Sequence, residues 1–373
     1  MKHNKSVKLL TLATTTAAVL LLAACSASNE QPVVPPTSDT PNAPALSGTL
    51  NLGGSSAQTA AQTTWRAAFQ SANSAVSVNY DPLGSGAGRT GFADGAYAMA
   101  GTDDAFQLSD IASTEFKLCA TGSGIVELPV YVSPIAVAYN LPGITELKLD
   151  AASVAAIFTG RITQWNDPAL LALNPNVALP ELNITTVHRA DKSGTTGNFT
   201  DYLTDAASEF WTAGRTESWP AELSGEAAEK TQGMRQALEA ANGAIGYIDV
   251  SQVGSLGMAS LLVQGTAVEP TAAAAAKALA GSGLEAGRSN IDLAYDINRV
   301  PTDNTAYPLI MVSYLVACQQ YQDATTAELV KAYATHVISE AAQSAAAKDA
   351  GSVSLWEDAA LQKRVADAAE AIR

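Results

Sequence analysis

The chain has 373 residues with 21 basic and 36 acidic side chains, which give a formal net charge of −15 at pH 7. This acidic balance argues against nucleic acid as a partner. Hydrophobic residues make up 47% of the chain, and its length is greater than one compact core usually needs, so we expect two lobes.

The N-terminus has the composition of an export signal. Three lysines precede an apolar run over residues 9–24 that is too short to span a membrane. The run ends in Leu22-Ala23-Ala24-Cys25, which resembles the lipidation motif of bacterial lipoproteins. We predict a signal peptide over residues 1–24, a lipid anchor on Cys25 and a location on the extracytoplasmic face of the cell membrane. An ordinary signal peptide with an incidental cysteine is the alternative.

The composition of residues 25–46, which are rich in Ser, Pro, Asn and Thr, predicts a flexible tether.

Strand and helix patterns alternate beyond the tether. The strand candidates are β-branched or alternating apolar segments bounded by turn residues, namely Leu46–Leu52, Val76–Tyr80, Val126–Tyr139, Ile184–Val187, Ala244–Val250 and Tyr307–Ala317. The helix candidates repeat apolar residues at spacings of three and four, namely Ala57–Phe69, Ala151–Asn174, Phe199–Leu203, Glu226–Ala241, Ala272–Leu279, Thr325–Ile338 and Leu361–Ile372. This alternation predicts an α/β chain with mostly parallel sheets. The two longest strand candidates are suited to crossing from one lobe to the other.

Three strand-to-helix turns place a serine at the start of a helix, at Ser56, Ser85 and Ser193. The free backbone N–H groups and the positive end of the helix dipole make such a start an anion site. Arg189, before the third turn, adds a planar fork of donors that suits a tetrahedral oxyanion. Ligands of open α/β sheets bind outside the carboxyl ends of strands, so the three turns can surround one anion. A well-capped surface helix is the alternative for the third turn.

Other motifs in the sequence give weaker support for a function. The segment Gly86-Ala87-Gly88-Arg89-Thr90-Gly91 fits the glycine pattern of dinucleotide sites, but the second strand that such a site needs does not follow it. A serine hydrolase would need a G-x-S-x-G sequence, which is missing, and would have only His188 as a base near the anion turn. Histidines and carboxylates do not have the spacing of metal ligands. We expect no cofactor, no metal and no enzymatic activity.

Three segments combine into a specific pattern: Ile157-Phe158-Thr159-Gly160-Arg161-Ile162-Thr163-Gln164-Trp165-Asn166-Asp167-Pro168, Arg189-Ala190-Asp191-Lys192-Ser193-Gly194-Thr195 and Gly243-Ala244-Ile245-Gly246-Tyr247. In this order and spacing they resemble the phosphate-binding protein of the bacterial high-affinity phosphate ABC transporter. The resemblance implies a type II periplasmic-binding-protein fold, in which two α/β lobes close over the ligand around a two-segment hinge. Placed on this chain, it predicts lobe I as residues 47–131 and 310–373, and lobe II as residues 132–309.

The resemblance also implies a set of phosphate ligands. They are hydroxyl groups, backbone amides, one guanidinium and one carboxylate, from Ser56, Ala57, Ser85, Asp103, Arg189, Ser193, Gly194 and Thr195. Asp191 matches the residue that orients the arginine. Ser56 stands where other members have Thr, and the presence of Asp104 leaves open which carboxylate faces the ligand; we favour Asp103 by its position. Phosphate near neutral pH carries a proton that a buried carboxylate can accept, whereas sulfate carries none, so the carboxylate gives selectivity.

Two cysteines remain in the exported chain, Cys119 and Cys318. An oxidising compartment makes them a candidate disulfide, with two buried free thiols as the alternative. If the chain crosses between lobes near Val130 and Ile310, both cysteines lie in one lobe.

The leading hypothesis is a lipid-anchored, monomeric receptor. It binds inorganic phosphate outside the cytoplasmic membrane and delivers it to the permease of an ABC transporter. One alternative is the same fold binding another oxyanion or a phosphate ester. Another is a secreted phosphatase that uses His188.

Overall fold

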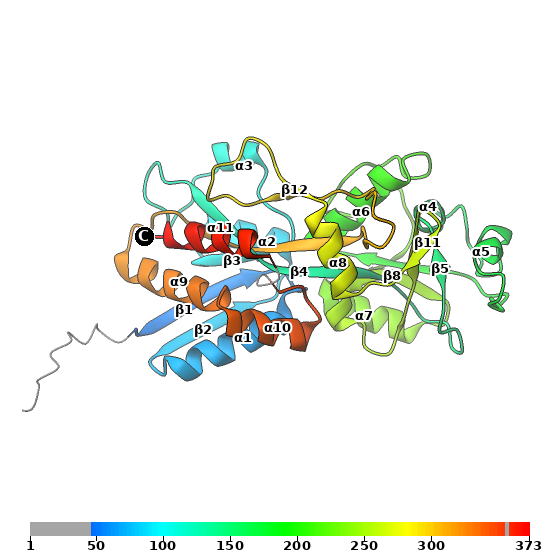
Figure 1. Cartoon of the computed structure of the whole chain (residues 1–373), viewed down its shortest axis with the longest axis horizontal. Helices are drawn as coiled ribbons and strands as arrows, with labels where there is room; N and C mark the ends of the chain where they lie inside the picture. The colour runs from blue at the N-terminus through cyan, green and yellow to red at the C-terminus, as the bar shows by residue number, and fades with distance from the viewer. Residues whose placement is uncertain (1–45, 355–357) are drawn as a thin grey trace, which may run out of the picture. The chain divides into compact units, whose positions relative to one another are not determined.

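The computed structural model describes residues 46–354 and 358–373. The predicted signal peptide, Cys25 and the predicted tether up to residue 45 lie outside the described residues. Within the described part, strands and helices alternate along the chain, as the sequence predicts (Figure 1).

A nine-stranded sheet runs through both halves of the fold. Its strands are β1 (Gly48–Gly54), β2 (Val76–Asp81), β3 (Met99–Thr102), β4 (Ile125–Tyr139), β6 (Thr185–Arg189), β7 (Glu226–Ala228), β8 (Ala244–Asp249), β9 (Gly257–Met258) and β14 (Ile310–Cys318). Their order is β2-β1-β3-β14-β4-β8-β6-β7, with β9 paired to β4. Two small sheets consist of β5 (Lys148–Leu149), β10 (Ser260–Val263) and β11 (Thr266–Val268), and of β12 (Gly283–Leu284) and β13 (Tyr295–Asp296).

The direction of the strands divides the sheet into two flanks and a centre. On the flanks, β1 is parallel to β2 and β3, and β6 is parallel to β7 and β8. In the centre, β14 is antiparallel to β3 and β4, and β4 is antiparallel to β8. The prediction of mostly parallel sheets is therefore right for the flanks and wrong for the centre, because there the chain crosses between lobes and returns.

The crossing strand β4 has all fifteen residues buried. All of its first ten residues except Val130 pair with β14, and from Ile135 to Tyr139 it pairs with β8 instead. Opposite Pro129, which cannot donate a ladder hydrogen bond, the register with β14 shifts between Ser313 and Tyr314. The strands β4 and β14 are thus the two segments of the hinge between the α/β lobes. The predicted lobe boundaries, after residues 131 and 309, stay a prediction.

Helices cover the two flanks separately. Around β1, β2 and β3 lie α1 (Thr59–Ala72), α2 (Ser85–Ala93), α3 (Leu108–Ser113), α9 (Ala324–Val337), α10 (Glu340–Ala350) and α11 (Ala359–Glu370) (Figure 1). The other lobe has α4 (Ala151–Phe158), α5 (Pro168–Leu173), α6 (Gly194–Ala206), α7 (Lys230–Ala240), the 3₁₀ turn η1 (Val250–Gln252) and α8 (Ala272–Ala280).

Two helix predictions need correction. The helical pattern over residues 151–174 is broken into α4 and α5, because Gly160 adopts a positive φ of 74° and Pro168 begins a new helix. The predicted helix over residues 226–241 begins with the short strand β7. Three residues are too few for a period to reveal a strand.

Candidate functional site

The predicted ligands follow the carboxyl ends of strands from both flanks. In lobe I, Ser85 is the first residue of α2 after β2, and Asp103 directly follows β3. In lobe II, Arg189 ends β6 and Ser193 caps α6, where its hydroxyl accepts a hydrogen bond from the Thr196 amide at 3.3 Å. Ser56 lies in the turn before α1, which begins at Thr59 rather than directly after the serine. This is the edge at which open α/β sheets bind ligands.

Asp103 lies at the centre of a set of hydroxyl groups. Its Oδ2 lies 3.4 Å from the Ser85 hydroxyl and 3.3 Å from that of Thr195, so both lobes reach it. Its Oδ1 accepts a hydrogen bond of 2.5 Å from Ser313 of β14. Burial raises the pKa of the Asp103 carboxyl, although the hydroxyl donors and the charge of Arg189 act the other way. The predicted carboxylate is therefore a buried group that only neutral donors contact directly.

Arg189 is held by Asp191 in a two-point contact. Its Nε donates to Oδ1 of Asp191 at 2.8 Å, and its Nη2 is paired with Oδ2. The backbone amide of Lys230 donates to the same Oδ1 at 2.9 Å. Burial opposes ionisation of Asp191, but the hydrogen bond and charge of Arg189 lower its pKa below the ordinary value. The guanidinium is 3% exposed, and Asp191 leaves Nη1 for a ligand.

Two glycines let the lobes approach each other at the site. A Cβ on Gly84, whose φ is 100°, would lie 2.4 Å from Oδ2 of Asp191. A Cβ on Gly194 would lie 2.8 Å from the Asp103 side chain. Both distances are shorter than real Cβ contacts, so only glycine permits this close approach of lobe I to lobe II.

The sequence missed a fourth turn that contributes a hydroxyl. The Ser56 hydroxyl lies 2.9 Å from that of Thr231 and accepts a hydrogen bond of 3.1 Å from its amide. Thr231 follows Lys230, the first residue of α7, which has a positive φ of 61°. The predicted donor amide of Ala57 bonds to the Ser55 hydroxyl at 3.1 Å. Ser56 thus contacts Thr231 of the opposite lobe, whereas Ser85 and Thr195 each contact Asp103.

Comparison with known proteins identifies the family. The chain matches the PBP superfamily domain over residues 39–341. It is 34% identical over 289 residues to the phosphate-binding protein PstS3 of Mycobacterium bovis, an alignment that covers 76% of this chain and 77% of that protein. The chain belongs to this family of phosphate-binding proteins.

Solved structures agree on the fold. A high affinity periplasmic phosphate-binding protein bound with phosphate is 20% identical, with a TM-score of 0.66 over 85% of this chain and 93% of that one. An ABC-type phosphate transport receptor from Vibrio cholerae is 15% identical, with a TM-score of 0.52 over 82% and 99%. At such identities the likeness shows the fold, which is the predicted two-lobed periplasmic-binding-protein fold.

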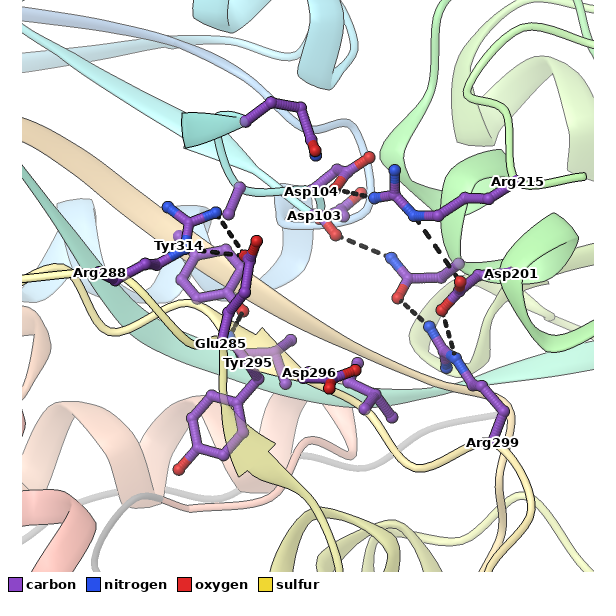
Figure 2. Close-up of a pocket in the computed structure, with 15 residues that line it drawn as sticks. Asp103, Asp104, Asp201, Arg215, Glu285, Arg288, Tyr295, Asp296, Arg299 and Tyr314 are labelled. Carbon is purple, nitrogen blue, oxygen red and sulfur yellow. Dashed lines mark hydrogen bonds and ion pairs between the residues drawn. The ribbon is translucent and has the colours of Figure 1, made fainter. Parts of the chain in front are cut away.

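In this member of the phosphate-binding protein family, Asp103 and Asp104 face different partners. Asp104 is ion-paired with Arg215, and the two line a polar cavity of about 360 Å³ beside Asp103 (Figure 2). Arg215 lies 3.8 Å from Asp201, which also pairs with Arg299 at 2.9 Å. A continuous series of ion pairs thus runs along the cavity from Asp104 to Arg299. Because Asp104 is engaged there, Asp103 is the carboxylate near the hydroxyl groups of the candidate site.

A second ion pair joins the lobes on the other side of Asp104. Arg89 of lobe I contacts both carboxylate oxygens of Glu217 of lobe II, at 2.5 and 2.6 Å. Lys192 lies 3.3 Å from the same carboxylate. Burial opposes ionisation of Glu217, but the charge of Arg89 and its hydrogen bonds lower the pKa. The Arg89–Glu217 pair thus connects lobe I to lobe II, and Lys192 adds a contact within lobe II.

The His188 side chain packs against an aromatic ring and the backbone. Its ring stacks on Trp219, with the ring centroids 4.8 Å apart and the planes 9° from parallel. Its Nδ1 lies 3.0 Å from the carbonyl oxygen of Arg189. These contacts hold the imidazole between the Trp219 ring and the backbone at the end of β6.

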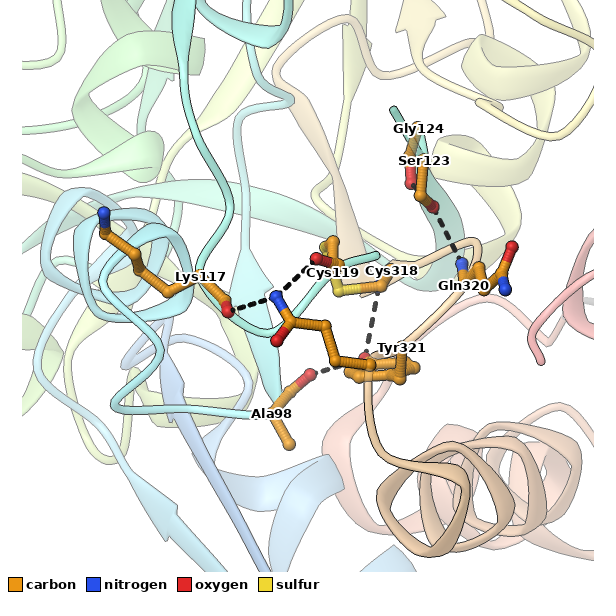
Figure 3. Close-up of a disulfide and its surroundings, with 9 residues drawn as sticks. Ala98, Lys117, Cys119, Ser123, Gly124, Cys318, Gln320 and Tyr321 are labelled. Atoms are coloured by element: carbon orange, nitrogen blue, oxygen red, sulfur yellow. Dashed lines mark hydrogen bonds between the residues drawn. A yellow bond between two sulfur atoms is a disulfide. The ribbon is translucent and has the colours of Figure 1, made fainter. Parts of the chain in front are cut away.

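The structure also bears on the predicted disulfide and on membrane-spanning helices. Cys119 and Cys318 form a disulfide, which confirms the predicted pairing (Figure 3). It joins the end of β14 to the loop after α3, and Tyr321 accepts a hydrogen bond of 3.2 Å from the Cys318 amide. Within residues 46–354 and 358–373, the helices are too short or too polar to cross a bilayer.

Proposed function

We propose that the protein binds inorganic phosphate between its two lobes and delivers it to the permease of an ABC transporter for uptake. The observation that carries this proposal is the position of Asp103. A carboxylate in an anion site would repel a fully ionised oxyanion, but it accepts a hydrogen bond from one that carries a proton. The names of the relatives, which are phosphate-binding proteins, point to the same ligand.

The attraction for the anion comes from lobe II. Arg189 supplies a guanidinium whose orientation Asp191 fixes, and α6 supplies the N–H groups of its first turn beside Ser193. The negative charge of the whole chain does not prevent this, because charges farther than about 10 Å are largely screened at moderate ionic strength. The proposed ligands are therefore Ser56, Ala57, Ser85, Asp103, Arg189, Ser193, Gly194 and Thr195.

The proposal includes the setting of the receptor. The protein is attached to the extracytoplasmic face of the cell membrane through a lipid on Cys25, acts as a monomer and has no enzymatic activity. The motif Leu22-Ala23-Ala24-Cys25 supports the anchor. A Cys25→Ser variant should leave the membrane fraction, and retention of that variant in the membrane would refute the anchor.

Isothermal titration calorimetry with phosphate and sulfate at pH 7 and matched ionic strength tests the binding function. We expect saturable heat with phosphate, one site per chain and an affinity for sulfate lower by about 10⁴. Equal affinities would instead indicate a general oxyanion receptor, and tighter binding of a phosphate monoester would indicate an ester receptor. Turnover of a generic phosphate ester that His188→Ala abolishes would replace the proposal with a phosphatase.

A further inference from the structure

A chain of buried hydrogen bonds leads from helix α9 to Asp103. Tyr333 donates to Oε1 of Gln62 at 2.9 Å, and Nε2 of Gln62 donates to Oε1 of Gln58 at 2.9 Å. Nε2 of Gln58 donates to the Ser313 hydroxyl at 2.6 Å, and Ser313 lies 2.5 Å from Oδ1 of Asp103. The first four side chains are completely shielded from solvent, and Asp103 is 3% exposed.

A backbone carbonyl determines which group donates and which accepts in this series of hydrogen bonds. The Gln58 amide also lies 3.0 Å from the carbonyl oxygen of Tyr314, which can only accept. The group facing that oxygen must therefore be the NH₂ group, and its second hydrogen is directed at Ser313. Because the Ser313 oxygen accepts from Gln58, its own hydrogen must go to another acceptor. Oδ1 of Asp103 at 2.5 Å is the nearer of the two available, the other being the Thr102 carbonyl at 3.3 Å.

Because of this donor-to-acceptor order, the two carboxylate oxygens of Asp103 have different hydrogen-bond partners. Oδ1 always receives the Ser313 hydrogen, so a proton on this oxygen would collide with a donor. Oδ2 has the longer contacts to Ser85 and Thr195, and the Ser55 hydroxyl also hydrogen-bonds the carboxylate, so Oδ2 is the oxygen available for a hydrogen on a ligand. We propose that Ser313, oriented by Gln58, is a positioning residue that keeps Asp103 a hydrogen-bond acceptor and so makes the site select oxyanions that carry a proton. This inference rests on the proposed phosphate-binding function.

The surroundings of Asp103 contain few other groups that titrate. Arg189 on β6 acts on it through charge, Tyr80 on β2 is buried nearby, and Asp104 is its neighbour in the chain. A change at Ser313 leaves these three groups in place. Its effect on the anion preference can therefore be assigned to the hydroxyl group.

The test compares Ser313→Ala with a matched control, Ser133→Ala. Ser133 is a completely buried serine on the neighbouring hinge strand β4. Its hydroxyl lies 3.3 Å from the carbonyl oxygen of Pro134 and hydrogen-bonds a different buried carboxylate, that of Asp249. Calorimetry with phosphate and with sulfate is run from pH 5 to pH 8. A hydrogen bond to a charged group contributes about 1.5–3 kcal/mol, so Ser313→Ala should lower the phosphate-to-sulfate affinity ratio by about 10- to 100-fold.

The pH profile separates this role from simple packing. Without the Ser313 hydrogen, Asp103 is protonated at higher pH, so phosphate binding should weaken at a higher pH than in the wild type. Sulfate binding should strengthen there, because a protonated carboxyl can donate. Ser313→Thr restores a hydroxyl and should recover the wild-type ratio, and Ser133→Ala should not change it.

The outcomes are distinguishable. A wild-type protein without preference for phosphate overturns the proposed function, and this inference with it. A wild type that prefers phosphate, together with a Ser313→Ala variant of unchanged ratio and pH profile, overturns the inference alone. If Ser313→Ala does not fold, Gln58→Met, which cannot donate to Ser313, carries the same expectation with a smaller change, and an unchanged ratio there is equally decisive.

Discussion

Asp103 in lobe I and Asp191 in lobe II are two carboxylates at one site, and they are held in opposite ways. Asp191 pairs with a guanidinium, which lowers its pKa, whereas Asp103 receives only hydroxyl hydrogens and burial raises its pKa. The first arrangement aims a positive charge at an anion. The second presents an acceptor that distinguishes one anion from another. In our proposal, lobe II therefore provides attraction and lobe I provides discrimination.

Replacing the discriminating carboxylate should have the largest effect. In Asp103→Asn the amide can donate to a fully ionised oxyanion, so the phosphate-to-sulfate affinity ratio should fall by about 10³- to 10⁴-fold. Calorimetry with both anions measures the ratio. Asp104→Asn is the matched control, because its side chain faces Arg215, and it should keep the ratio. A preserved ratio in Asp103→Asn would contradict the division of roles.

Removing the attracting charge should have the next largest effect. Arg189→Met removes the positive charge that faces the anion and should weaken binding of phosphate by about 10²- to 10³-fold, since losing one partner of a buried charge pair costs about 2–5 kcal/mol in binding. In contrast to Asp103→Asn, the phosphate-to-sulfate ratio should remain. Arg235→Met, which removes an exposed pair with Glu239, serves as the control in the same titrations. Loss of selectivity in Arg189→Met would show that the two roles are not separate.

Contacts between the lobes should affect both anions equally. Glu217→Gln weakens the pairing with Arg89 that joins lobe II to lobe I, and also the pairing with Lys192 within lobe II. We expect phosphate affinity to fall by about 10-fold, mainly through faster dissociation, since such a contact stabilises the closed form. Stopped-flow dissociation measurements test this, with Glu239→Gln as an exposed control. A change confined to the association rate would speak against a role in closure.

The smallest effects should appear in stability without ligand. Because the pKa of Asp103 is raised in the folded state, the unfolding free energy should increase as the pH falls from that value towards the ordinary one near 3.9. The lowered pKa of Asp191 has the opposite sign, so its contribution is present above about pH 3.9 and is lost as the pH falls through the folded value. Urea unfolding of the wild type, Asp103→Asn and Asp191→Asn between pH 3 and 8 separates the two. Parallel profiles for all three proteins would contradict both shifts.

Much of the fold follows from local patterns. The buried run of β4 and the helix start at Ser193 are contiguous in sequence, and each carries its own signal in the form of an apolar run or a capping serine. The antiparallel centre could not be predicted in this way, because strand direction depends on how distant segments pair. The strand β7 was missed because three residues carry no period.

The sequence by itself determined the parts of the site that are local in the chain. Arg189, Asp191 and the first turn of α6 lie within nine residues, so their chemistry can be identified before any packing is known. Only the tertiary structure shows how the surroundings of Asp103 and Asp104 differ, because the two are adjacent in sequence and differ only in the partners that folding brings to them. It also brought Thr231 to Ser56 and Ser313 to Asp103. These residues are far apart in sequence, and a hydroxyl group has no local pattern that predicts its distant partner.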